Sequence, residues 1–191
     1  MTGRARLRVA GVVLLLAAQS GGAAPGGDTP SRVVRRFYEW TLRNGEQVRR
    51  LEPRVSWDPE NRRLALDTTT LPEFVAAFMD SGLFAPEFAT ILSGYYRNHG
   101  EVIAATPPDL LDSYAMHGRD ILLETEDMDI FFCAQEMQYT TTFIRRMTLR
   151  TVHADADRTD VRSTSTYGWK TDFTLRRVDG RWRIAGYCVF R

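Results

Sequence analysis

The chain has 191 residues, of which 43% are hydrophobic and 26% charged, and its formal net charge is +1 at pH 7. This length suits one domain with a hydrophobic core of its own. Acidic and basic side chains nearly balance and form no basic stripe, so we predict no nucleic-acid partner, because such binding depends on neutralising phosphates.

The N-terminus has the three zones of a secretory signal peptide. Three arginines precede an apolar run over residues 9–18, and small residues follow. This run is far shorter than the roughly 20 residues that cross a bilayer, so we expect cleavage after Ser20 or Gly22 and no stable membrane span in the mature chain. Loss of the three arginines lowers the net charge from +1 to −2. We therefore predict a secreted or periplasmic protein with a signal peptide (1–22), a flexible linker (23–29) and a single domain (30–191).

A first helix is predicted to begin at Thr29-Pro30, with the threonine as N-cap and the proline at the first helical position. Apolar residues at helical spacing continue to about Arg43, and Asn44-Gly45 is expected to end the helix. Residues 49–67 have no sustained period and are expected to form a loop, with a short strand near 63–66.

Two further helices follow. Thr70 and Glu73 have the spacing of a capping box, which predicts a helix over residues 71–80. Pro86 begins the next helix, in which apolar residues recur at i, i+3, i+4 and i+7 toward Asn98. Residues 109–135 support no single assignment.

From Tyr139 onward the hydrophobic period changes to two, which is typical of strands. Four strands are predicted, over residues 139–153, 159–167, 169–178 and 181–190. Asp179-Gly180 is the predicted turn of the last hairpin, because both residues tolerate the positive φ angles of a type I′ turn. Counting outward from this turn pairs Val178 with Arg181, Arg177 with Trp182, Leu175 with Ile184 and Phe173 with Gly186. The residues expected on the core face are Phe173, Leu175, Trp182 and Ile184.

The order of these elements, helices first and long strands last, favours an α+β fold with the helices on one face of an antiparallel sheet. Three segments also carry a family resemblance: VVRRFYEWTL in the first helix, DMDIFFCAQE in the middle and TLRRVDGRWRI in the closing hairpin. Together they resemble the exported bacterial domain of unknown function 3828 family, in the nuclear transport factor 2-like superfamily. The resemblance implies a cone-shaped fold, in which N-terminal helices pack on a strongly curved antiparallel sheet of four or slightly more strands, with a pocket at the open end.

Aromatic residues of the first and third helices are candidates for lining a ligand pocket, because such pockets are mostly apolar. A hydrophobic core explains the same residues more simply. Arg145 is also a candidate, because on the first predicted strand it would share a face with core residues and would need a carboxylate or an open pocket. The pocket candidates are Phe37, Tyr38, Trp40, Tyr95 and Arg145.

The sequence contains no catalytic signature, so no catalytic residue is assigned. An acid/base enzyme using the pocket would draw on Tyr114, His117, Asp127 or Asp129. The two aspartates are explained more simply as acceptors of backbone N–H groups in a turn. The histidines are scattered and the acidic segment lacks the ligand pattern of an EF-hand loop, so we predict no metal site and no cofactor.

Cys133 and Cys188 are the two cysteines of the chain. An oxidising compartment permits a disulfide between them. Two buried thiols are the alternative, because the sequence does not give the distance between the two Cα atoms.

These features favour a non-enzymatic binding or interaction protein with a small molecule or a protein as partner. The resemblance suggests a narrower form, an immunity protein that blocks an effector delivered into the periplasm. The alternative is a small-molecule acid/base enzyme of the isomerase or dehydratase type, using the same pocket. A homodimer is compatible with either hypothesis.

Overall fold

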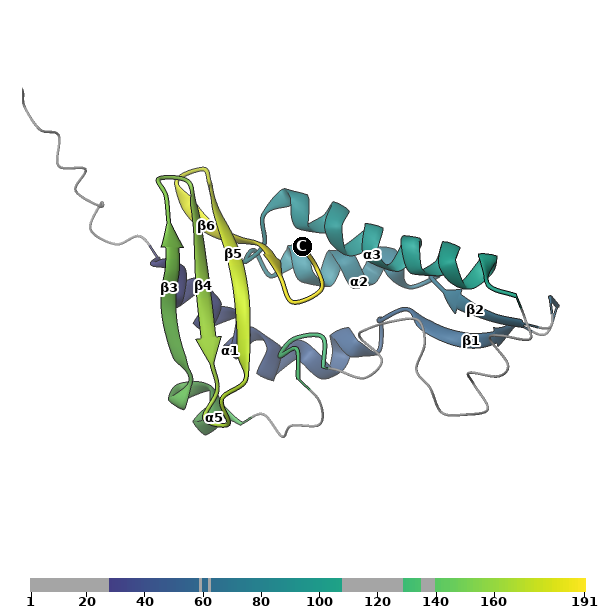
Figure 1. Cartoon of the computed structure of the whole chain (residues 1–191), viewed down its shortest axis with the longest axis horizontal. Helices are drawn as coiled ribbons and strands as arrows, with labels where there is room; N and C mark the ends of the chain where they lie inside the picture. Colours follow the sequence, from purple (N-terminus) through teal and green to yellow (C-terminus); the bar gives the residue numbers. More distant parts are fainter. Residues whose placement is uncertain (1–27, 59, 62, 108–128, 135–139) are drawn as a thin grey trace, which may run out of the picture.

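A computed structural model of the chain describes residues 28–58, 60–61, 63–107, 129–134 and 140–191. Within this part, helices come first and a four-stranded antiparallel sheet comes last, which confirms the α+β class (Figure 1). The signal peptide and most of the linker, as predicted from the sequence, lie outside the described residues.

The first helix, α1 (Pro30–Arg49), begins where predicted, and the Thr29 hydroxyl accepts a hydrogen bond of 3.3 Å from the backbone N–H of Arg32. It does not end at Asn44-Gly45. Gly45 is buried inside the helix, at a point where a Cβ atom would lie 3.3 Å from the ring of Phe131. The glycine therefore allows a distant segment to pack closely, and its interpretation as a helix terminator was wrong.

The segment expected to be mainly a loop is a hairpin, in which β1 (Arg54–Asp58) pairs with β2 (Arg63–Asp67). Only β2 was predicted; β1 has the same length of five residues, and its sequence RVSWD was not recognised as a strand. The next helix, α2 (Leu71–Asp80), has its predicted bounds. The third, α3 (Pro86–Ala105), extends beyond its predicted end and packs against α2 and β2.

The main sheet is the predicted meander, with strands paired in chain order and all antiparallel. Figure 1 shows these strands on one side of the molecule, with α3 beside β6. The strands are β3 (Thr148–Ala154), β4 (Arg158–Thr164), β5 (Lys170–Val178) and β6 (Arg181–Tyr187).

The first strand of this sheet begins later than predicted, because Thr141–Arg146 forms the short helix α5. The Thr140 hydroxyl caps this helix by accepting a hydrogen bond of 3.2 Å from the N–H of Phe143. A run of threonines and large apolar residues is typical of a strand, and the cap overrides that preference. Arg145 is exposed on α5, so its expected inward position on a strand was wrong.

The closing hairpin has its predicted turn, with φ angles of 50° at Asp179 and 74° at Gly180. The three pairs nearest the turn are confirmed. A register shift between Thr174 and Leu175 then places Gly186 opposite Thr174, so the expected pairing of Phe173 with Gly186 was wrong.

The core lies between α1, the inner face of the sheet and the N-terminal half of α3. Phe37 lies at its centre, with ring centroids 5.7 Å from Phe84 and Phe173 and 5.0 Å from Tyr187. Trp182 is only half-buried, because it lies near the turn, where the guanidinium of Arg177 covers its ring at 4.9 Å. The fully buried aromatic residues are Phe37, Tyr38, Phe74, Phe78, Phe88, Tyr96, Phe131, Phe173, Tyr187 and Phe190.

Candidate functional site

The outer face of the sheet carries a groove of about 770 Å³. Alternate residues of β4 and β5 are buried in the core, so the residues between them point to the opposite side of the sheet. Further lining comes from α3 and from the C-terminal residue. The charged lining consists of four acids, Glu87, Asp157, Asp160 and Asp172, and four arginines, Arg158, Arg162, Arg176 and Arg191.

One ion pair crosses the floor of this groove. Arg162 and Asp172 lie directly opposite each other on β4 and β5, and the guanidinium donates two hydrogen bonds to the carboxylate, at 2.6 and 2.8 Å. The hydrogen bond from Arg162 lowers the pKa of the Asp172 carboxyl below its usual range. The two side chains are 42% and 38% exposed, so solvent screens the pair and it stabilises the fold little. It remains accessible to a partner.

Other charged groups of the groove differ in the hydrogen bonds and ion pairs that they form. Arg176 donates to Glu87 at 3.1 Å and so links β5 to α3. The Thr174 hydroxyl donates to Asp160 at 2.8 Å. The guanidinium of Arg158 is exposed and has no ion pair or hydrogen bond with the residues that the structure describes. The groove therefore presents both signs of charge, with hydrogen-bonding capacity left over.

The predicted pocket residues of α1 belong to the core and do not line this groove. Phe37 and Tyr38 are fully buried. The hydroxyls of Tyr38 and Ser163 share a hydrogen bond of 2.8 Å, and burial raises the pKa of Tyr38 to about 12. Trp40 is half-buried, with its ring 5.6 Å from Phe78 and 6.1 Å from Phe131.

The remaining two pocket candidates lie on other elements. Tyr95 is half-buried on α3, with its ring 4.3 Å from His99 and 5.1 Å from Phe190. Arg145 is exposed on α5, next to the sheet rather than inside it.

Asp129 supports a turn, as the sequence suggested. Its carboxylate accepts backbone hydrogen bonds from Phe131 at 2.9 Å and Phe132 at 3.0 Å, and it forms an ion pair with Arg49 of α1. Burial raises the pKa of this carboxyl, and the charge of Arg49 opposes the shift. The other three acid/base candidates, Tyr114, His117 and Asp127, lie outside the described residues.

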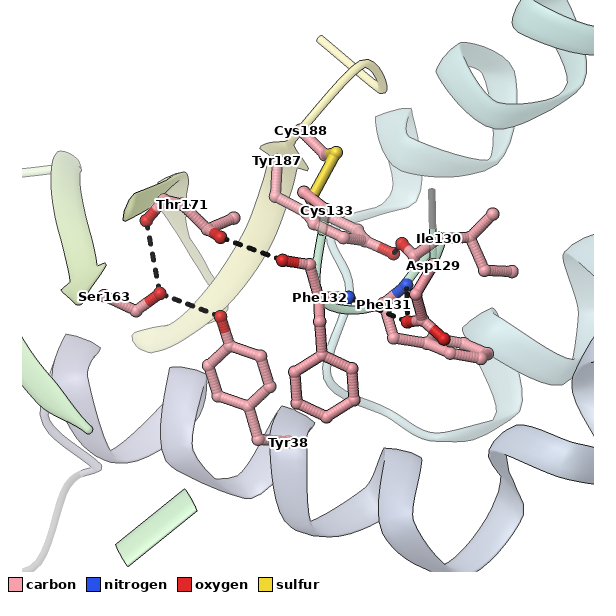
Figure 2. The surroundings of a disulfide bond; sticks show 10 residues. All are labelled: Tyr38, Asp129, Ile130, Phe131, Phe132, Cys133, Ser163, Thr171, Tyr187 and Cys188. Atoms are coloured by element: carbon pink, nitrogen blue, oxygen red, sulfur yellow. Dashed lines mark hydrogen bonds between the residues drawn. A yellow bond between two sulfur atoms is a disulfide. The ribbon is translucent and has the colours of Figure 1, made fainter. Parts of the chain in front are cut away.

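A disulfide joins Cys133 to Cys188, with Cα atoms 5.9 Å apart, which decides between the two alternatives left open by the sequence. Figure 2 shows the bond together with nearby hydrogen bonds that also hold residues 129–134 in place. The Tyr187 hydroxyl donates to the carbonyl of Ile130 at 2.9 Å, and the Thr171 hydroxyl donates to that of Phe132 at 3.2 Å. The disulfide and these hydrogen bonds therefore fix residues 129–134 between α1 and the C-terminal residues. The bond is compatible with an oxidising location.

A site for a metal is not found among the described residues, in which no three or more His, Cys, Asp or Glu side chains come together as ligands. None of the described helices is long and apolar enough to cross a membrane.

The groove residues were not among the candidates named from the sequence. A signal for them exists, because charged residues or Thr174 alternate with smaller uncharged or apolar ones along 159–163 and 171–176 and so mark an outward polar face. The contributions of Glu87 and Arg191 have no such signal, since they depend on how α3 and the C-terminus pack beside the sheet.

In comparisons with known proteins, no protein-family model, no curated protein and no solved structure matches this chain. The nuclear transport factor 2-like resemblance therefore stays a prediction from the residues that carry it.

Proposed function

We propose that this chain is an exported, non-enzymatic binding protein that holds a polypeptide partner in the groove on the outer face of its sheet. The observation that carries the proposal is the accessible, mixed charge of the groove: an ion pair about two-fifths exposed and an arginine without a partner among the described residues. Charged groups of both signs at an interface contribute orientation and specificity. A polypeptide supplies both signs along one segment.

Two further features support this choice. Small-molecule pockets are predominantly apolar, whereas eight of the thirteen residues that line this groove are charged. Asp129, one of the acid/base candidates from the sequence, already accepts hydrogen bonds from two backbone N–H groups and forms an ion pair with Arg49. Export is supported by the predicted leader and is compatible with the disulfide.

The test is a charge exchange between the two paired strands. In the double variant Arg162→Asp, Asp172→Arg the ion pair is retained and its direction is reversed, so the fold is kept and the pattern presented to a partner is inverted. An affinity tag is placed within residues 23–27, before Asp28 and the helix cap Thr29, because a tag at the C-terminus would lie next to Arg191, which lines the groove. The tagged protein is recovered from the cells that make it naturally.

We expect one partner to be recovered with the wild-type protein and with the control Arg43→Glu, and at least tenfold less with the double variant. Arg43 is a suitable control because it is exposed on α1 and does not line the groove. Equal recovery with a double variant that melts at the wild-type temperature would contradict the proposal.

A further inference from the structure

A second cavity, of about 470 Å³, lies at the turn end of the β5–β6 hairpin. It is bordered by the start of α1, by the connection between α2 and α3, and by the first residues of β6. Three arginines and one aspartate line it, namely Arg36, Arg181, Arg183 and Asp28, and give the lining a net charge of +2. The larger groove has equal numbers of acidic and basic side chains, so the two sites differ in charge.

The single carboxylate of this lining is already engaged. Asp28 forms ion pairs with Arg36 and, at 3.8 Å, with Arg32. In the part of the chain that the structure describes, neither Arg181 nor Arg183 has an ion pair or a hydrogen bond through its guanidinium. The positive charge of the cavity is therefore not neutralised by the described residues.

Arg183 is the better fixed of the two free arginines. It is half-buried, and its Nη1 atom lies 3.4 Å from the position of a Cβ atom built on Gly82. The connection that contains Gly82 is attached to β6 by two backbone hydrogen bonds, from Ile184 N–H to Leu83 O at 2.9 Å and from Ala85 N–H to Ile184 O at 2.8 Å. Its neighbours thus define where this guanidinium lies.

The position of Arg183 in the sheet is unfavourable without an anion. Arg158, Arg176 and Arg183 occupy directly paired positions on β4, β5 and β6, so three arginines project from the same face of the sheet at adjacent positions. Like charges at directly opposite positions destabilise a sheet. Glu87 neutralises Arg176, the middle member of the row. A bound anion would relieve the repulsion at Arg183.

We propose that this cavity binds a phosphate or sulfate group through the guanidinium groups of Arg181 and Arg183. A guanidinium presents a planar fork of N–H donors that matches the oxygens of such an anion in bidentate fashion. A phosphate ester carries a charge of about −1.5 to −2 at neutral pH, which matches the lining charge of +2. None of the residues that line this cavity lines the groove proposed to hold the polypeptide partner.

The test is isothermal titration of the full mature protein with inorganic phosphate, with sodium chloride added to equalise ionic strength. The variants are Arg183→Gln and Arg181→Gln, and the matched control is Arg43→Gln, which removes an exposed arginine far along α1. We expect saturable binding to the wild type and the control, and an affinity at least tenfold lower in both cavity variants. Arg181 is exposed, so its variant keeps the test valid if the loss of half-buried Arg183 disturbs folding.

A second arm identifies the source of the phosphate. Flotation with vesicles of phosphatidic acid in phosphatidylcholine tests a phosphate monoester on a lipid, and free phosphate tests a soluble ligand. Binding in either arm that depends on Arg181 and Arg183 supports the site. The proposal is overturned if the wild type shows no saturable binding in either arm, or if all four proteins bind equally.

Discussion

At the scale of single residues, the clearest case is Asp129, a largely buried carboxylate that two backbone N–H groups and one arginine hold in place. Its neighbours satisfy the charge only in part, because burial still raises the pKa of the carboxyl. This residue thus has the raised pKa often found at active sites, together with contacts that are those of a turn.

The raised pKa gives Asp129 a defined effect on stability. A carboxyl whose pKa is higher in the folded than in the unfolded chain contributes most below the unfolded pKa of about 3.9, and that contribution is lost as pH rises through the folded pKa. We therefore expect Asp129→Asn to remove part of the fall in the free energy of unfolding as pH rises from about 3 to 7. Urea unfolding at a series of pH values measures the free energy of unfolding of the wild type and the variant. An unchanged pH profile in the variant would assign the fall to other groups.

Phe173 and Trp182 test the difference between full and partial burial. Phe173 is fully buried, so Phe173→Ala is expected to cost about 3–5 kcal/mol of unfolding free energy. Trp182 is half-buried against Arg177, so Trp182→Ala is expected to cost only about 1–2 kcal/mol. Urea denaturation of the two variants is the measurement. Equal costs would show that Trp182 is as central to the core as the sequence suggested.

At the scale of elements, two glycines are expected to respond oppositely to the same substitution. A Cβ atom on Gly186 of β6 would lie 2.9 Å from the carbonyl oxygen of Phe190, so Gly186→Ala is expected to destabilise the fold by about 1–3 kcal/mol. Gly94 lies inside α3 with no atom within 4 Å of such a Cβ, so Gly94→Ala is expected to stabilise it by about 0.5–1 kcal/mol. Thermal unfolding compares them. A Gly186→Ala variant as stable as the wild type would refute the close contact with Phe190, and a loss of stability in Gly94→Ala would refute the open space beside that glycine.

The disulfide links two elements that are 55 residues apart in the chain. Removing a cross-link of this span returns conformational entropy to the unfolded state, which for such a loop corresponds to about 4 kcal/mol. We expect the double variant Cys133→Ala, Cys188→Ala to lose about 2–4 kcal/mol of unfolding free energy. A reductant should destabilise the wild-type protein similarly and leave the variant unchanged. A reductant effect on the variant would show that the loss has another origin.

Short sequence motifs predicted the structure correctly where the conformation depends only on neighbouring residues. The Asp179-Gly180 turn and the Thr29-Pro30 helix start are such cases, because φ angle and capping chemistry depend on near neighbours. They failed at Gly45, which lies inside α1 and allows Phe131, from a distant part of the chain, to pack closely against the helix. They failed again at α5, where strand-forming residues occupy a capped helical turn.

At the scale of the whole molecule, the α+β class followed from the order of helices and strands, and the candidate groove did not. The outward polar face of β4 and β5 can be read from its period of two, but Glu87 and Arg191 join it only after α3 and the C-terminus pack beside the sheet. The predicted pocket residues Phe37 and Tyr38 also depended on packing that the sequence does not show. Their aromatic character fits a pocket or a core equally well, and only packing places them in the core.

The most direct test of the central claim is photo-crosslinking in living cells, with a photoreactive amino acid in place of Thr174 on the floor of the groove or of Arg43 on α1. We expect one discrete adduct from position 174, which disappears when Arg162→Asp and Asp172→Arg are added, and none from position 43. An adduct from position 43 without one from position 174 would contradict the claim that this groove holds the partner.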